Sequence, residues 1–438
     1  MSPKFLSIIL LTLLLVAGSV FAFASTGQPN MQRAGGQTTI FNRSFRAFEL
    51  PAEGLSESEL ARHTETDPLF ERSHIPLDDH QGAGLGPLHN AKSCASCHVL
   101  NGRGRPIEGQ SLFRIALREN GGTRPVPELG FQLQDRATFG NQPEAIVLRN
   151  WVKTGKLRRL VTEMKTSDGI DLAEAKVSRS LRIPPPLIGL GLIELIPDED
   201  ILARSDPEDL DGDGISGKPV WNRDEKGEIR LGRFGWKAIA TSLRQQSIDA
   251  YNEDMGITTP LGPKTNLSKR GLPADISWEE LEGVTFYSQT LGAPATVKGP
   301  NSQIVQSGFR IFNDLHCASC HVPRQETGIS SHAVAQVINN QTIWPYTDLL
   351  VHDMGPGLDD GVAEHGLSES SEWRTAPLWG IGLTKRVNHK ASFLHDGRAR
   401  SIEEAILWHG GEANSSKEQF EALTTNERAQ LLDWLNQL

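Results

Sequence analysis

The chain has 438 residues, enough for about two or three domains of ordinary size, and its composition is that of a globular protein. Lysine and arginine number 44 and aspartate and glutamate 54, so the net charge is −10 at pH 7. This acidic balance argues against nucleic acid or an anionic membrane surface as a partner, because both are negatively charged.

The first 24 residues have the three parts of an export signal peptide. Lys4 is the positive start, residues 5–20 form an apolar run, and Ala22-Phe-Ala24 is the small-residue cleavage site. An uncleaved anchor helix is the alternative, because the apolar run approaches the ~20 residues that span a bilayer. We favour cleavage because the Ala-x-Ala pattern directly follows the apolar run. The mature protein is then expected in the periplasm, without stable insertion into the membrane.

Residues 25–50 are rich in glycine, glutamine, threonine and asparagine, and we interpret them as a loose leader before the first domain. Ser56 and Glu59 then have the spacing of a capping box, so a short helix is expected to begin here. A glycine-rich turn over residues 82–87 follows and leads the chain to its first conspicuous motif.

Two identical pentapeptides, Cys-Ala-Ser-Cys-His, stand at residues 94–98 and 317–321 and use all four cysteines of the chain. C-x-x-C-H is the attachment signature of a c-type haem, in which two thioethers hold the porphyrin and the histidine binds the iron. A zinc site built from both cysteine pairs, or two short disulfides, would leave the two histidines unexplained. Thiol–disulfide exchange needs a reactive thiol, which thioether-linked sulfurs do not have.

The motifs therefore predict two covalently bound haem c groups. In bacteria this attachment takes place in the periplasm, in agreement with the export signal. The residues concerned are Cys94, Cys97 and His98 for the first haem and Cys317, Cys320 and His321 for the second. Arg103 and Arg105 follow the first motif, and their guanidinium groups either bind haem propionates or belong to a solvated basic loop.

Residues 111–174 alternate loosely between apolar and polar positions, with glycine and proline breaks, and indicate strands or irregular structure. The pattern P-L-x-G-x-G-L occurs at residues 186–192 and again at 377–383, downstream of each haem motif. This repeat indicates two related halves. The spacing is longer in the first half, which indicates an insertion there.

From these features we expect two cytochrome c-like haem domains, an N-terminal one over residues 51–298 that carries the insertion and a C-terminal one over 299–438. The predicted fold class is mainly α, with long irregular loops. Helices are expected over 232–256, 279–290, 302–315, 402–409 and 424–435.

Asp209-x-Asp211-x-Asp213-Gly is the start of a calcium-binding loop, with glycine at the tight turn. The twelfth position, where an EF-hand needs a bidentate glutamate, is Val220, so the loop is not a standard EF-hand. Calcium bound by the three aspartates and a plain acidic turn remain open alternatives. A cation here would lie between the halves and could fix their relative orientation.

The distal side of each haem decides whether the iron carries electrons or binds a substrate. For the second haem, His409 falls on the apolar face of helix 402–409, together with Ile402 and Ile406. An inward histidine is more often a hydrogen-bonded core residue, so that interpretation also stays open. The other candidates for this position are Met354, His352, His389 and His395.

Three segments, Arg374-Thr-Ala-Pro-Leu, Phe393-Leu-His-Asp-Gly-Arg-Ala399 and Ser401-Ile-Glu-Glu-Ala405, resemble the C-terminal haem domain of bacterial di-haem cytochrome c peroxidases. The methylamine-utilisation di-haem enzymes share this pattern. Nearly all of the mature chain is more similar still to the di-haem oxidoreductases, some of which are labelled thiol oxidoreductases. The segments that carry this similarity are 84–94, 209–214, 253–258, 352–357, 393–398 and 408–412.

The resemblance implies roles for several residues. In the peroxidases the helix after F-H-D-G carries the distal methionine of the electron-transfer haem, and that position corresponds to His409. Their N-terminal haem binds the substrate, which makes the haem of His98 the reactive centre here. Met255 is a candidate sixth ligand and Glu194 a candidate acid or base, against the alternatives of a core methionine and a surface acid. Candidates for a tryptophan that passes electrons between the haems are Trp151, Trp236 and Trp379.

The sequence thus predicts a periplasmic di-haem c-type oxidoreductase, in which the C-terminal haem relays electrons to a reactive N-terminal haem. Hydrogen peroxide is the leading candidate substrate, by family analogy alone. The alternative is a pure electron-transfer cytochrome with both irons six-coordinate. The expected partners are a small periplasmic electron-transfer protein and a small-molecule oxidant or reductant.

Overall fold

The computed structural model describes residues 31–76, 84–119, 122–155, 157–167, 172, 176–261, 274–299, 301–330, 334–364 and 367–438. The predicted signal peptide, residues 1–24, lies outside the described residues. Among the helices of the described ranges, none is both long enough and apolar enough to cross a membrane.

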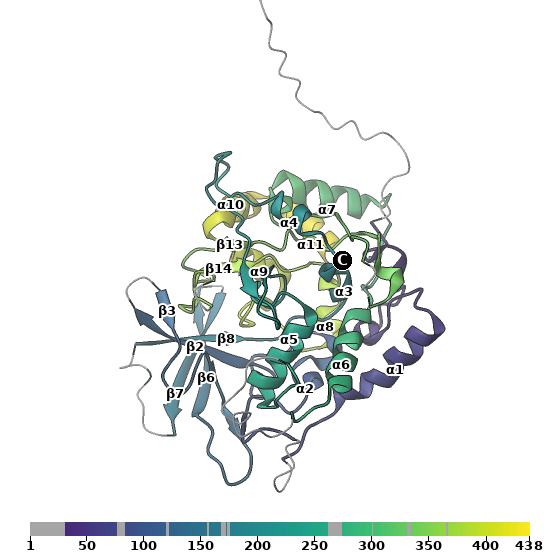
Figure 1. Ribbon diagram of the computed structural model, residues 1–438. Coiled ribbons are helices and arrows are strands. Elements are labelled where there is room, and N and C mark those ends of the chain that lie inside the picture. The colour runs from purple at the N-terminus through teal and green to yellow at the C-terminus, as the bar shows by residue number, and fades with distance from the viewer. Residues whose placement is uncertain are drawn as a thin grey trace, which may run out of the picture.

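The prediction of a mainly α fold is wrong, because helices hold 32% of the residues and strands 19%. Most of the long strands lie in the insertion of the N-terminal half. That insertion is long enough to form a sheet and a hairpin of its own, which lie beside the helices as a separate β region (Figure 1).

The sheet of the insertion is antiparallel and is centred on β2 (Leu112–Glu119). Strand β8 (Val177–Arg182) pairs along one edge of β2, and β3 (Gly122–Arg124) and β4 (Gln132–Leu133) pair with it as well. A hairpin of β6 (Ala145–Thr154) and β7 (Leu157–Thr166) packs beside this sheet. The alternation of apolar and polar residues thus forms strands here, as the sequence pattern allowed.

Helices of the N-terminal half pack around the first haem motif. The motif itself forms α2 (Cys94–Cys97), and the helices around it are α1 (Glu57–Glu71), α3 (Leu190–Glu194), α5 (Leu243–Asp249) and α6 (Trp278–Thr290). The expected capping box of Ser56 and Glu59 is present at the start of α1. The helix expected over 232–256 begins only at Leu243, because the residues before it form a turn, and it ends in a π-helical turn over Ala250–Asp254.

The C-terminal half is built on α7 (Gln303–Asp314), α9 (Ile402–Leu407), α10 (Asn414–Ala422) and α11 (Thr425–Leu435). α7 and α11 cross closely at Gly308, where an added Cβ would lie 2.1 Å from the Cβ of Trp434. Phe312 and Trp434 are both buried at this crossing, with ring centroids 4.9 Å apart. The two helices lie where the sequence predicted them.

The described part of the leader, residues 31–50, is packed rather than loose. Ala47 and Phe48 are fully buried, and Ile40 forms a β-bridge with Pro294. The backbone amide of Trp344 donates a hydrogen bond to the carbonyl of Ala34, so the segment also contacts the C-terminal half. The segment is mostly polar, so its composition did not indicate that a few apolar residues anchor it in the core.

Short elements complete the fold, and several of them form two-stranded antiparallel pairs. These pairs are β1 (Leu88–His89) with β5 (Arg136–Ala137), β9 (Trp221–Arg223) with β10 (Ile229–Leu231), β11 (Gln325–Glu326) with β12 (Thr342–Ile343), and β13 (Val351–Asp353) with β14 (Glu372–Arg374). The remaining short helices are α4 (Asp198–Leu202) and α8 (Thr384–Val387).

Candidate functional site

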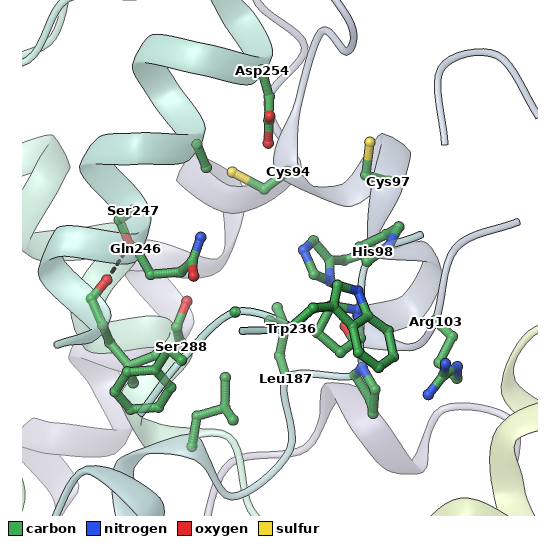
Figure 2. A pocket seen from close by; sticks show the side chains of 18 of the residues that line it. Cys94, Cys97, His98, Arg103, Leu187, Trp236, Gln246, Ser247, Asp254 and Ser288 are labelled. Carbon is green, nitrogen blue, oxygen red and sulfur yellow. Dashed lines mark hydrogen bonds between the residues drawn. The ribbon is translucent and has the colours of Figure 1, made fainter. Parts of the chain in front are cut away.

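The first Cys-Ala-Ser-Cys-His segment lines a cavity of about 240 Å³ in the N-terminal half, called cavity 1 below (Figure 2). Cys94 and Cys97 lie on the single turn of α2. The hydroxyl of Ser93 accepts a hydrogen bond from the backbone amide of Ser96 at 3.0 Å and so caps this turn. The cap holds both sulfurs on the same wall as His98, which directly follows the turn.

The imidazole of His98 is oriented by the backbone. Its Nδ1 lies 2.9 Å from the carbonyl oxygen of Pro185, which can only accept a hydrogen bond. Nδ1 therefore carries the hydrogen, and the lone pair of Nε2 is left for another partner. Burial lowers the pKa of His98 to about 4, so the ring is neutral at pH 7. A neutral, oriented imidazole is what an iron ligand must be.

The second Cys-Ala-Ser-Cys-His segment lines a cavity of about 210 Å³, called cavity 2 below. Here Nδ1 of His321 lies 3.1 Å from the carbonyl oxygen of Tyr346. Burial, helped by the nearby His409, lowers the pKa of His321 to about 4. The two motifs thus present their histidines in the same way, although their surroundings differ in sequence.

His409 lines cavity 2 together with His321, as the resemblance implied. Its Nδ1 lies 2.7 Å from the carbonyl oxygen of Ala405, one turn earlier in the chain. Nε2 is again left for another partner, and burial lowers the pKa of this ring. Cavity 2 is therefore bordered by two neutral imidazoles prepared in the same manner.

Two of the other candidates for the distal position, His352 and His389, are less suited. Nε2 of His352 lies 2.8 Å from Asp348 and its Nδ1 2.6 Å from Glu412, so both nitrogens are already paired. These carboxylates raise the pKa of His352 well above its usual value, against the effect of burial. His389 is exposed and lies outside the lining of cavity 2. Met354 and His395 do line the cavity.

His395 packs face to face on an aromatic ring, with its centroid 3.8 Å from that of Trp373. Burial lowers the pKa of His395 well below its usual value, and the cations Arg398, Arg182 and Lys237 act in the same direction. The imidazole is consequently neutral, and it lies in a positively charged part of the cavity wall.

A structural repeat relates the walls opposite the two proximal histidines. Phe234 forms an antiparallel bridge with Ala240, and Phe393 forms the same bridge with Ala399. Each bridge is followed, two residues on, by a serine whose hydroxyl caps a helix by accepting a hydrogen bond at 3.1 Å. The helices are α5 after Ser242 and α9 after Ser401. In the sequence this repeat leaves only the pattern Phe-x₅-Ala-x-Ser. Three matching residues in nine positions are too few to reveal the repeat without the structure.

The repeat places Ala250 at the position of His409. Both residues stand eight positions after the capping serine, and both line the corresponding cavity. At this position of the repeat, cavity 1 thus has a methyl group and cavity 2 has an imidazole. The repeat also places Gln246 at the position of Ala405.

Two polar side chains that sequence reasoning did not single out as functional extend into cavity 1. Figure 2 shows the Gln246 amide and the Asp254 carboxylate directed into the space beside His98. Within the described residues, the side chain of Gln246 makes no hydrogen bond. Oδ1 of Asp254 accepts one from Nε2 of Gln132 at 2.8 Å.

The carboxyl of Asp254 is poised to exchange a proton near neutral pH. Burial raises its pKa to about 7, and the neighbouring charge of Glu253 acts in the same direction. Groups with such a pKa are suited to general acid–base catalysis. Its position directly before Met255 could have suggested it, but the pKa depends on burial, which one sequence does not reveal.

Met255 and Glu194, the two residues predicted for cavity 1, differ in outcome. Met255 lines the cavity and is packed in the core with Phe70 and Tyr251. Glu194 lies outside the cavity lining, and its two oxygens accept hydrogen bonds from the amide of Leu243 at 2.8 Å and from Gln289 at 2.5 Å. Glu194 therefore fixes the start of α5 rather than facing the cavity.

The two cavities share one wall. The residues that line both are Arg103, Pro186, Trp236, Arg374, Ala376, Pro377 and Trp379. Trp236 and Trp379, two of the three candidates for an electron-passing tryptophan, thus lie on this shared wall. Trp151 lies in β6 of the insertion and lines neither cavity.

Comparison with protein families explains this architecture. The family described as "Di-haem oxidoreductase, putative peroxidase" matches residues 29–124 and 160–438. The chain belongs to this family of di-haem oxidoreductases. The resemblance of the sequence to the di-haem oxidoreductases is thereby confirmed. Membership of this family supports haem as the cofactor. The unmatched residues include β4, β5 and β6 of the insertion.

Other comparisons add little to the family assignment. Among solved structures, this oxidoreductase is similar to hydrazine synthase from Kuenenia stuttgartiensis, with 13% sequence identity over the full length of both chains. The TM-score is 0.37, too low to support an inference about fold. No curated protein matches the chain.

The residues of both cavities fit a haem. Each cavity has a largely apolar lining, two cysteines on one turn, and a neutral histidine with Nε2 available. Arginines on the shared wall supply positive charge for the propionates that a haem carries. The covalent attachment of two haems remains a prediction from the motifs.

The aspartates of the predicted calcium loop are arranged differently from the expectation. The carboxylates of Asp206, Asp209 and Asp211 lie within 4.8 Å of one another. Asp213 is not part of this group, although its carboxylate, like the other three, accepts a hydrogen bond from a backbone amide of the loop. Asp206 therefore takes the place of Asp213 in the cluster, and calcium binding stays a prediction.

Proposed function

We propose that this chain is a periplasmic c-type di-haem oxidoreductase whose C-terminal haem relays electrons and whose N-terminal haem reacts with a small oxidant. Cys94, Cys97, Cys317 and Cys320 would form the thioethers. His98 and His321 would hold the two irons from the proximal side. When bound, each haem supplies an iron that can accept and donate single electrons.

The observation that carries this proposal is the exchange of His409 for Ala250 between equivalent positions of the repeat. An iron held by two histidines passes electrons without binding a substrate, whereas an iron with a small residue opposite can take a ligand. The repeat thus supports a division of labour between two motifs that are identical in sequence.

Hydrogen peroxide is the oxidant that the polar groups of cavity 1 suit best. Its reduction breaks one O–O bond and consumes two electrons and two protons to give two molecules of water. With a pKa of about 7, the Asp254 carboxyl can take a proton from one peroxide oxygen and return it to the other. The Gln246 amide can donate a hydrogen bond that orients the bound oxidant.

The electrons would come from a small periplasmic electron-transfer protein. The chain carries a net charge of −10, so a donor with a basic surface would be attracted to it. The export signal and the two C-x-x-C-H motifs together support the periplasm, because thioether attachment takes place there. Trp236 and Trp379 lie on the path from one cavity to the other.

Optical spectra with added ligands test this proposal. Pyridine haemochrome spectra should give two haems per chain, and cyanide or peroxide should change the spectrum of one of them. Two haems that bind neither ligand would contradict the proposal and support the alternative of a pure electron-transfer cytochrome. Met255, which lines cavity 1, would then be the residue to examine as a sixth ligand.

A further inference from the structure

Two arginines, the half-buried Arg103 and the buried Arg374, lie on the wall that the cavities share. Arg103 follows the first haem motif by five residues, and Arg374 ends β14 in the C-terminal half. Both side chains line both cavities, and Arg374 is only 9% exposed. A charged group in this place acts on both cavities at once.

Neither arginine has a carboxylate partner among the described residues. Nε and Nη2 of Arg103 donate to the carbonyl oxygens of Ser392 and Leu394 at 3.0 and 2.7 Å. Nε and Nη1 of Arg374 donate to those of Gly235 and Thr375 at 2.9 and 3.1 Å. Nη1 of Arg103 and Nη2 of Arg374 have no hydrogen bond to a described residue.

Other arginines nearby do form ion pairs with carboxylates. Arg114 lies 3.0 Å from Glu364 and also pairs with Glu253, and Arg182 lies 2.6 Å from Asp360. Asp348 acts on Arg374 only at a distance, and its carboxylate is hydrogen-bonded to His352. The protein therefore neutralises its other buried guanidinium groups here but leaves these two uncompensated.

An unpaired buried cation is costly, because it loses its hydration without gaining a counter-charge. Burial accordingly lowers the pKa of Arg103 and of Arg374 to about 10. Arg103 also contributes to the positive field that keeps His395 neutral. This wall is thus prepared for anions that the chain itself does not supply.

We propose that Arg103 and Arg374 bind haem propionates from both cavities and thereby couple the two haems electrostatically. This inference rests on the proposed function, since it requires a haem in each cavity. Guanidinium groups pair strongly with carboxylates, and the one free Nη atom of each arginine carries two N–H groups that can donate to a propionate. Because each arginine faces both cavities, either cation raises the reduction potential of both haems.

Potentiometric titration of the holoprotein, followed in the visible spectrum, tests the inference. Arg103→Gln and Arg374→Gln should each lower both midpoint potentials, because the lost positive charge stabilised the reduced irons. We expect about a tenfold change in each ferric–ferrous equilibrium, which is 59 mV for a one-electron couple. Arg103→Lys and Arg374→Lys keep the positive charge, so both midpoint potentials should stay close to those of the unaltered protein.

Arg105→Gln is the matched control. Arg105 belongs to the same loop, donates to Oε1 of Gln110 at 3.1 Å and lines neither cavity, so its loss should leave both potentials unchanged. A second signature separates propionate binding from a structural role. Without its arginine a propionate regains a higher pKa, so both potentials of the glutamine variants should fall more steeply as pH rises through that pKa.

The outcomes are distinguishable from those of the proposed function. Fewer than two haems in the unaltered protein would contradict the proposed function itself. Two haems, with potentials that the glutamine variants do not move, would overturn this inference alone. A shift confined to one haem would also overturn it, because the shared wall requires both to respond. If a glutamine variant does not fold, the lysine variant of the same arginine is measured in its place. A lysine variant that binds two haems but has potentials different from those of the unaltered protein contradicts the inference.

Discussion

Cavity 1 and cavity 2 are built from the same pentapeptide and differ on the wall opposite to it. In both, a backbone carbonyl holds Nδ1 of the proximal histidine, at 2.9 Å for His98 and 3.1 Å for His321. The opposite wall comes from α5 in one cavity and from α9 in the other. Under the proposed function, both motifs hold a haem, and one position of the repeat, Ala250 or His409, accounts for the different use of the two cavities.

The largest effect should come from making cavity 1 like cavity 2. Ala250→His places an imidazole at the position equivalent to His409, so it should fill the sixth position of the N-terminal haem. Peroxide reduction should fall by about 100-fold or more, since a blocked site loses binding and catalysis together. Absorption spectra should show two low-spin haems, and steady-state assays with peroxide measure the loss.

Ala250→Ser is the control for this substitution, because it keeps a small side chain and should retain most of the activity. Unchanged peroxide reduction in Ala250→His, with a histidine-ligated N-terminal iron, would show that chemistry does not occur in cavity 1. That outcome would contradict the proposal that the N-terminal haem reacts with peroxide while the C-terminal haem relays electrons.

The carboxyl of Asp254 in cavity 1 should have the next largest effect. Asp254→Asn removes the carboxyl whose pKa is raised to about 7, and peroxide reduction should fall by about 100- to 1,000-fold. If ionised Asp254 is the base, the rate of the unaltered protein rises with pH through about 7, and the asparagine variant should lose this limb. Rates measured between pH 5 and 9 check this.

Glu253→Gln sharpens the same prediction. It removes a charge that raises the pKa of Asp254 but keeps the Asp254 carboxyl, so the rising limb of the pH–rate profile should move to lower pH rather than disappear.

The free energy of unfolding gives a second, independent test of the raised pKa of Asp254. Because the folded protein holds the Asp254 proton more tightly, this carboxyl lowers the free energy of unfolding as pH rises from 4 to 7. Asp254→Asn should therefore gain stability relative to the parent at pH 8 but not at pH 4, in denaturant titrations.

Much of the site could be predicted from the sequence, because the C-x-x-C-H motif and the capped helix before His409 are local patterns. Ala250 could not, since the repeat around Phe234 and Phe393 keeps three identical residues and its meaning depends on positions in space. The position of Glu194 outside cavity 1 could not be predicted either, because its carboxylate accepts a hydrogen bond at the start of α5, which depends on how α3 and α5 pack. The fold class was missed because alternation over 111–174 gives no measure of how many strands pair.

A smaller effect is expected between the cavities. Trp236→Phe removes one of the two indoles on the shared wall, so electron transfer from one haem to the other should slow by about tenfold while peroxide binding is kept. Stopped-flow spectroscopy of the reduced protein mixed with peroxide measures this step. Trp151→Phe changes an indole that lines neither cavity, and an equal slowing in that variant would count against the shared wall as the path.

The smallest effect concerns the acidic loop. If Asp206, Asp209 and Asp211 bind calcium, saturating calcium at 100 times the dissociation constant stabilises the protein by about 2.7 kcal/mol. Thermal unfolding with and without chelator should reveal this, and Asp209→Asn should abolish it. Asp213→Asn should keep the response, because the carboxylate of Asp213 lies outside the cluster of the other three. A loss of the response in Asp213→Asn alone would favour the arrangement expected from the sequence.

Electron paramagnetic resonance of the oxidised holoprotein, with His409→Ala beside it, tests the difference between the cavities most directly. The unaltered protein should give one high-spin signal from cavity 1 and one low-spin signal from an iron held by His321 and His409. In His409→Ala the low-spin signal should be replaced by a second high-spin signal, while the first stays as it was. Signals that are the same in both proteins would contradict the account.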